Sequence, residues 1–107
     1  MLLSTLQEER NLWIAHNFPD GTLEDCIFGA VEEMGELAHH FLKRKQGIRG
    51  DDTKHEAGML DSVADAVIFL AGVPTYLGVN YGELVQATWN MVRTRDWVRY
   101  PENGRTA

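Results

Sequence analysis

Two groups of carboxylates are the residues of this sequence most able to do chemistry. Glu33 and Glu36 are three residues apart, and Asp61 and Asp65 are four apart. In a helix, both spacings place the two side chains on one side of the helix. Each pair borders a stripe of apolar residues, where an unpaired ionised carboxylate carries a desolvation cost of several kcal/mol. The spacing therefore indicates that something neutralises these acids.

A hard divalent cation is the neutralising partner that this chemistry favours. If the two helices pack antiparallel, the two acidic pairs face each other and repel. Oxygen ligands select Mg²⁺, with Mn²⁺ as a substitute, and Mg²⁺ keeps coordination positions open for water and substrate phosphates. The paired acids therefore predict a magnesium site that accepts a phosphorylated small molecule.

Hydrophobic periodicity predicts an all-α fold that positions these acids. The expected helices span residues of about 4–17, 22–46, 53–72 and 81–97. The residues expected to cap their N-termini are Ser4, Thr22, Thr53 and Asn80. Gly47 suits the end of the second helix, and Pro74 should kink or end the third. We expect one domain over 1–107, with its core at about 22–97 and a loose tail at 98–107.

Composition excludes several classes of protein. The chain has 107 residues, a formal net charge of -6 and no long basic run, which argues against binding to duplex nucleic acid. Cys26 is the only cysteine, so no internal disulfide and no cysteine-based zinc site forms, and we expect it to be a small core residue. We see neither a leader segment nor a membrane span of about 20 apolar residues, and expect a cytoplasmic protein.

The acidic motifs resemble those of the MazG-like nucleotide pyrophosphohydrolases, an all-α family. The likeness covers roughly residues 25–101. It rests on Glu32-Glu33-Met34-Gly35-Glu36 followed by Leu37-Ala38, and on Asp61-Ser62-Val63-Ala64-Asp65 followed by Ala66-Val67-Ile68-Phe69-Leu70. Gln46-Gly47-Ile48-Arg49-Gly50 and Arg95-Asp96-Trp97 are similar to the short phage and bacterial members. Ser62 stands where the family usually has Glu.

The resemblance implies both a fold and an activity. The fold is a four-helix bundle completed by homo-oligomerisation, as a homodimer or homotetramer. The activity is Mg²⁺-dependent hydrolysis of a nucleoside triphosphate, ribo or deoxy, to the monophosphate and pyrophosphate. The implied metal ligands are Glu33, Glu36, Asp65 and, in place of the missing Glu, Asp61. Either Glu32 or Glu36 would orient the attacking water.

Several cations and an amide are candidates for holding the substrate. Lys43, Lys45 and Arg49 follow the acidic helix, where they serve either phosphates or the negative C-terminal end of that helix. Asn90 and Arg93 match an Asn-x-x-Arg pattern of the family, which implies a sugar or phosphate contact for the former and a phosphate contact for the latter.

Two other functions compete with this reading. Glu36-x-x-His39 fits a di-iron carboxylate motif, but such bundles need a second Glu-x-x-His, which the chain lacks. We therefore expect His39 and His40 to lie on a polar face. The Ser62 departure also allows a non-catalytic helical module that keeps the fold for regulation or oligomerisation.

Overall fold

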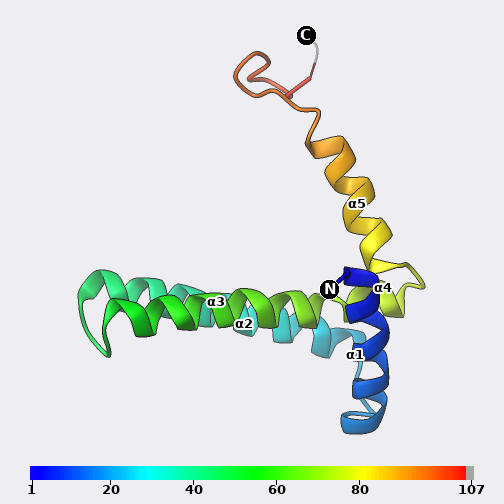
Figure 1. Cartoon of the computed structure of the whole chain (residues 1–107), viewed down its shortest axis with the longest axis horizontal. Coiled ribbons are helices and arrows are strands. Elements are labelled where there is room, and N and C mark those ends of the chain that lie inside the picture. Colours follow the sequence, from blue (N-terminus) through cyan, green and yellow to red (C-terminus); the bar gives the residue numbers. More distant parts are fainter. Residues whose placement is uncertain (106–107) are drawn as a thin grey trace.

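The computed structural model describes residues 1–105, and every regular element within them is a helix. The helices are α1 (Leu3–Asn17), α2 (Leu23–Gln46), α3 (Asp52–Leu70), the short α4 (Gly72–Tyr76) and α5 (Tyr81–Val92). Figure 1 shows α2 and α3 side by side as one long hairpin, with α1 across its open end and α5 standing away from it. The all-α prediction is confirmed.

Local capping chemistry fixes the ends of the hairpin helices. The side chain of Thr22 accepts a hydrogen bond from Asp25 N, and the Asp25 carboxylate accepts one from Thr22 N, which completes a capping box. Gly47 ends α2 with a left-handed φ of 72°, as expected. The expected cap at Thr53 is wrong: Asp51 caps α3 instead, because its carboxylate accepts from Lys54 N at 2.8 Å.

Small side chains let α2 and α3 approach closely along their contact, which we call the seam. Its buried residues on α2 are Cys26, Ala30 and Glu33, and those on α3 are His55, Ser62 and Ala66. Gly29 shows how tight the approach is, since a Cβ there would lie 2.3 Å from the Phe69 ring. The seam therefore buries mainly small side chains and leaves little room for long ones, so we expect the long side chains buried in it to have a defined role.

Two histidines close the far end of the hairpin. His55 is almost fully buried, and its Nε2 lies 2.9 Å from the Ile48 carbonyl oxygen, which makes Nε2 the protonated nitrogen. His55 Nδ1 then accepts from His40 Nδ1 at 3.1 Å. The expectation that His40 lies on a polar face is wrong, because its ring turns toward α3. This pair fastens the loop at 47–51 to both helices.

A buried glutamine joins α1 to the C-terminal half of the chain. Gln7 Nε2 donates to Thr75 Oγ1 at 3.1 Å and to the Val79 carbonyl at 2.9 Å. Its Oε1 accepts from Tyr81 N at 2.8 Å. One side chain thus satisfies the backbone where α4 ends and α5 begins.

Three other boundaries differ from the sequence prediction. The first helix begins at Leu3, with no side-chain cap. The third ends at Leu70 instead of residue 72, and α4 then carries Pro74. The fourth, α5, is capped by Asn80 as expected but ends at Val92 and not at residue 97.

Side-chain hydrogen bonds turn the chain after α5. Thr94 Oγ1 donates to the Met91 carbonyl, and the Asp96 carboxylate accepts from Val98 N and Arg99 N. The expected loose tail instead contains turns, with Asp96 N donating to the Gly104 carbonyl at 2.7 Å. Residues 106 and 107 of that tail lie outside the described residues.

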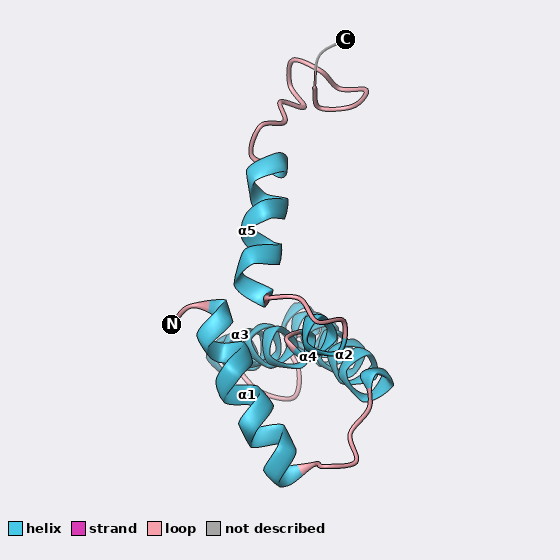
Figure 2. Ribbon diagram, turned by 90° about the vertical axis from the view of Figure 1, so that its right-hand side faces the viewer, coloured by secondary structure: helices cyan, strands magenta, loops and turns pink. Residues whose placement is uncertain are grey.

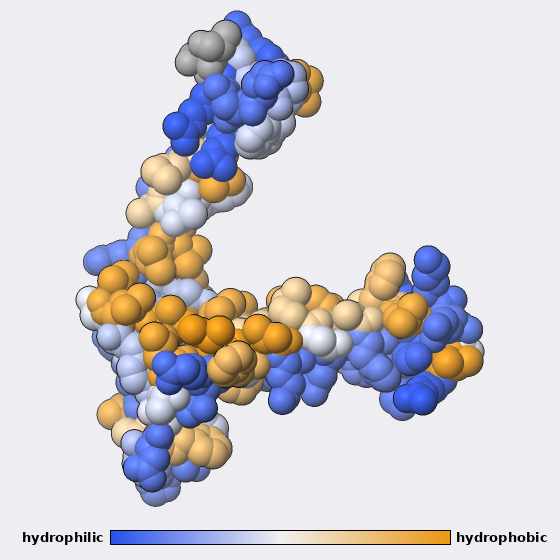
Figure 3. Space-filling model, turned by 180° about the vertical axis from the view of Figure 1, so that it is seen from behind, coloured by the Kyte–Doolittle hydropathy of each residue, from blue (hydrophilic) through white to orange (hydrophobic). Residues whose placement is uncertain are grey.

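The chain alone buries few of its large apolar side chains. Its radius of gyration is 17.5 Å, against about 13 Å for a compact domain of this size. Figure 2 looks along the hairpin and shows α5 rising clear of the other helices. Figure 3 shows apolar residues gathered where the hairpin meets α1 and the base of α5. Several large apolar side chains of α2 lie outside the seam and are exposed, among them Phe28, Val31 and Met34.

One helical stretch corrects the expectation that no segment is long and apolar enough to span a membrane. Asp52–Tyr76, which joins α3 and α4, is the one stretch in residues 1–105 long and apolar enough to cross a membrane. This is weak evidence, because core helices of soluble proteins pass the same test. The stretch also carries Asp61 and Asp65 near its middle, where charged groups are costly in lipid.

We predict that His55→Ala lowers the free energy of unfolding by about 2 kcal/mol or more, because it leaves the Ile48 carbonyl unpaired and opens a cavity. Urea unfolding followed by circular dichroism measures this. The control is His16→Ala on the exposed face of α1, which should cost less than about 1 kcal/mol. Equal costs for the two variants would contradict the role given to the histidine pair.

Candidate functional site

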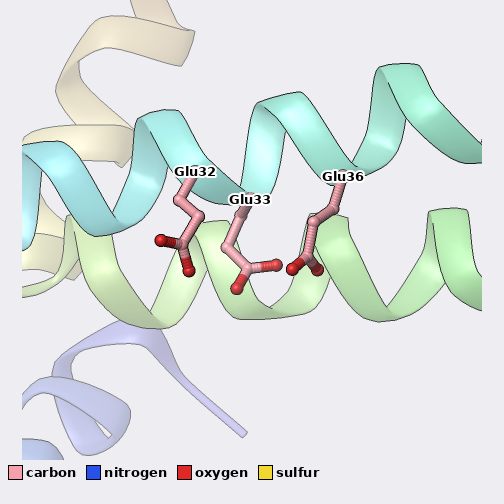
Figure 4. A group of neighbouring side chains, drawn as sticks. All are labelled: Glu32, Glu33 and Glu36. Atoms are coloured by element: carbon pink, nitrogen blue, oxygen red, sulfur yellow. The ribbon is translucent and has the colours of Figure 1, made fainter.

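Three carboxylates of α2 meet halfway along the hairpin. Oxygen atoms of Glu32, Glu33 and Glu36 all lie within 4.8 Å of one another. Figure 4 shows the three side chains on one side of α2, directed toward α3, with Glu33 in the middle. Glu32 and Glu36 are exposed, whereas Glu33 is buried. The cluster therefore has a buried centre and two ligands open to solvent.

Glu33 is held in an environment that opposes its charge. Only 8% of the residue is exposed, and its Oε2 is buried without a hydrogen-bond partner. Burial, followed by the negative charges of Glu36, Asp65 and Glu32, raises the pKa of the Glu33 carboxyl above its ordinary value of 4.5. An unpartnered buried oxygen beside other carboxylates is what a bound divalent cation would satisfy.

Helix α3 presents its acids to this cluster unequally. Asp65 is exposed and does not belong to the group whose oxygens lie within 4.8 Å of one another, but its negative charge contributes to raising the pKa of Glu33. Ser62 lies buried in the seam, where its hydroxyl donates to the Gly58 carbonyl at 3.0 Å. Asp61 lies on the exposed side and is not among the groups that shift the pKa of Glu33. Its role as fourth ligand stays a prediction.

The cations that follow the acidic motif lie far along α2. Lys43 is ten residues beyond Glu33, about 15 Å along the axis at 1.5 Å per residue. Its Nζ points further away, donating to Gln46 Oε1 at 3.0 Å. Lys45 and Arg49 are exposed at the same end of the hairpin. Within residues 1–105 no ion pair joins these three residues to the acidic cluster.

The C-terminal candidates are also remote. Asn90 and Arg93 belong to the outer end of α5, which Figure 1 shows well away from the hairpin. Both residues are exposed, and Asn90 Oδ1 accepts a hydrogen bond from Gln86. A phosphate bound at the acidic cluster would meet Asn90 and Arg93 only on another copy of the chain.

The structure adds a feature that sequence reasoning missed. A cleft of about 910 Å³ lies among α1, the start of α2 and the end of α3, and its lining includes Asp65. Arg10 also lines it, although only 8% of this residue is exposed. Its guanidinium lies against Cys26, which is buried as expected. The burial of Arg10 depends on contacts with distant residues, so no local pattern could have revealed it.

We predict that Glu33→Gln raises the melting temperature of the metal-free protein at neutral pH. A raised carboxyl pKa means that the folded state gains from protonation. The stability linked to Glu33 is therefore fully present below pH 4.5 and is lost as the pH rises through the raised pKa. The difference between variant and wild type should accordingly grow with pH in differential scanning fluorimetry with EDTA.

The matched control is Glu8→Gln, which removes one exposed charge from α1. Adding millimolar Mg²⁺ should then stabilise the wild type and Glu8→Gln more than Glu33→Gln. A lower melting temperature for metal-free Glu33→Gln at neutral pH would show that the Glu33 charge is already compensated within the protein.

Comparison with known proteins adds no further constraint on the site. No protein-family model, curated protein or solved structure matches the chain.

Proposed function

We propose that the protein hydrolyses nucleoside triphosphates to monophosphates and pyrophosphate with the help of Mg²⁺. The observation that carries the proposal is Glu33, a buried carboxylate with an unpartnered oxygen at the centre of an acidic cluster. The motifs around it resemble those of the MazG-like pyrophosphohydrolases. Magnesium bound there would neutralise the phosphate oxygens and help to activate a water molecule.

We assign different roles, metal binding or proton acceptance, to the residues of the cluster according to their exposure. Buried Glu33 is fixed by the seam and would hold the cation, together with Glu36 and Asp65. Exposed Glu32 or Glu36 is placed to accept a proton from the attacking water, since each has contact with solvent. Attack at the α-phosphorus breaks its bond to the bridging oxygen, which leaves with pyrophosphate.

A second copy of the chain is part of the same proposal. Within residues 1–105 no ion pair joins the acidic cluster to a cation, and α5 exposes Leu84, Trp89 and Met91. Isolated helices shorter than about 12–15 residues are marginal in water, and α5 has 12 residues packed mainly on α1. Packing the exposed faces against a second copy would bury them and bring Asn90 or Arg93 to a substrate. We infer a homodimer or homotetramer.

A non-catalytic role is the second candidate, and Ser62 favours it. This residue fills the seam position where the family usually carries Glu, and its hydroxyl is already used within α3. The fold would then serve assembly or regulation without turnover. For either role we propose the cytoplasm, because a lone buried thiol suits a reducing compartment.

We predict Mg²⁺-dependent release of pyrophosphate from a panel of ribo- and deoxynucleoside triphosphates. Glu36→Gln, Asp65→Asn and Asp61→Asn should each lower kcat/KM at least about tenfold, or about 1.4 kcal/mol in the barrier, since each removes a charge from the metal shell. Ser62→Ala is the matched control on α3 and should have far less effect. Near-normal turnover in Asp61→Asn would leave Asp65 as the sole ligand from α3. No release from any nucleotide would favour the non-catalytic role.

We also predict that the protein is an oligomer at micromolar concentration, because its exposed apolar faces are large for a chain of 107 residues. Light scattering coupled to size exclusion measures the mass. Trp89→Glu should shift the protein toward monomer, whereas Glu83→Gln, on the same helix but polar, should not. A wild-type protein that is monomeric at this concentration would overturn the assembly.

A further inference from the structure

Arg10 is a buried cation without an anionic partner. Its residue is 8% exposed, and its Nε is buried without a hydrogen-bond partner. Nη2 has only the Cys26 sulfur at 3.7 Å, a weak acceptor. Within residues 1–105 the structure gives no carboxylate in an ion pair with Arg10. A guanidinium costs a great deal to bury in this way unless an acceptor arrives from outside the chain.

The absence of a side chain at Gly72 leaves room for the side chain of Arg10. A Cβ at Gly72 would lie 2.3 Å from the Cys26 sulfur and 2.9 Å from Arg10 Nη1. The glycine at the start of α4 thus lets the guanidinium sit beside Cys26. Arg10 is therefore fixed by packing, while its Nε has no hydrogen-bond partner and its Nη2 has only the Cys26 sulfur.

The cleft that Arg10 lines has aromatic walls, which suit a ligand with a flat ring. Its volume is about 910 Å³, and its aromatic lining consists of Trp13, Phe18, Phe69 and Tyr76. Trp13 and Phe18 are in contact, with ring centroids 5.7 Å apart. Tyr76 is fixed by a hydrogen bond from its hydroxyl to the Gly21 carbonyl at 2.6 Å. Apolar walls with a few fixed polar groups are typical of small-molecule sites.

Asp65 connects the cleft to the acidic cluster. It lines the cleft, and its charge also acts on Glu33. A ligand in the cleft would thus be able to contact Arg10, the aromatic rings and Asp65. That arrangement suits a nucleotide whose base enters the cleft and whose phosphates lie at the cation.

We propose that Arg10 selects nucleotides by donating hydrogen bonds to a carbonyl-bearing base, guanine above all. Guanine O6 and N7 are adjacent acceptors that match the fork of a guanidinium, whereas adenine presents an amino donor in place of O6. This inference rests on the proposed function for the position of the phosphates. The contact between Arg10 and the base stands on the cleft alone.

The test is metal-free binding of nucleoside monophosphates, measured by isothermal titration calorimetry in EDTA. Guanosine monophosphate should bind at least about tenfold more tightly than 2-aminopurine riboside monophosphate, which differs from it by lacking O6 and the N1 proton. Inosine monophosphate, which keeps O6 and N7, should bind like the guanine nucleotide. Equal affinities for the guanine and 2-aminopurine nucleotides in the wild type would overturn the proposal.

Two variants then assign the discrimination to Arg10. Arg10→Gln should reduce the guanine preference to within about threefold, and so should Gly72→Ala, whose methyl group displaces the guanidinium. Arg99→Gln removes the same charge from the exposed C-terminal segment and should keep the full preference. A full preference in a folded Arg10→Gln, checked by circular dichroism, would overturn the proposal. If Arg10→Gln does not fold, Gly72→Ala and the wild-type comparison still decide.

The outcomes separate this inference from the proposed function. Guanine-selective binding without release of pyrophosphate would sustain the base contact and remove the hydrolase. Release of pyrophosphate with no difference between guanine and 2-aminopurine triphosphates would do the reverse.

Discussion

The close contact between α2 and α3 is the constraint on which the rest of the structure depends. Glycine, alanine, serine and cysteine bring the two helices together, and Gly29 against Phe69 sets the limit of approach. Within this narrow seam Glu33 is the one carboxylate buried among the described residues. Its burial is a structural cost that small apolar residues elsewhere in the seam do not have. A cation bound beside Glu33 would compensate the charge of this carboxylate and so offset the cost of burying it.

The two ends of the hairpin differ in how completely they are satisfied. At the loop end, His40, His55 and the Ile48 carbonyl satisfy one another within the chain. At the open end, Arg10 keeps an unused donor and the aromatic walls of the cleft remain accessible. Polar groups left unsatisfied in a folded chain point to the places where it meets something else. Among residues 1–105 they are Glu33, whose pKa the charge of Asp65 helps to raise, and Arg10, which lines the cleft together with Asp65.

Sequence patterns predicted the helices because these follow from local periodicity, whereas the convergence of Asp61 and Asp65 on the glutamates of α2 stays a prediction. Thr22, Gly47 and Asn80 mark helix ends by chemistry that few other residues offer, and the structure confirms all three. The expected end of α5 at residue 97 is wrong because Thr94 and Asp96 redirect the backbone by side-chain hydrogen bonds. The role of His40 and the burial of Arg10 come from contacts between distant segments, which periodicity cannot report.

The loop at 47–51 also determines the order in which the parts of the site form during synthesis of the chain. Its few residues join two helices that are consecutive in the sequence, so that their contact needs no later part of the chain. By the time residue 70 has been synthesised, every carboxylate of the cluster is present, whereas α5 is made later. A nascent chain would therefore have its acidic cluster assembled before it contains α5, the helix through which we expect it to contact another copy.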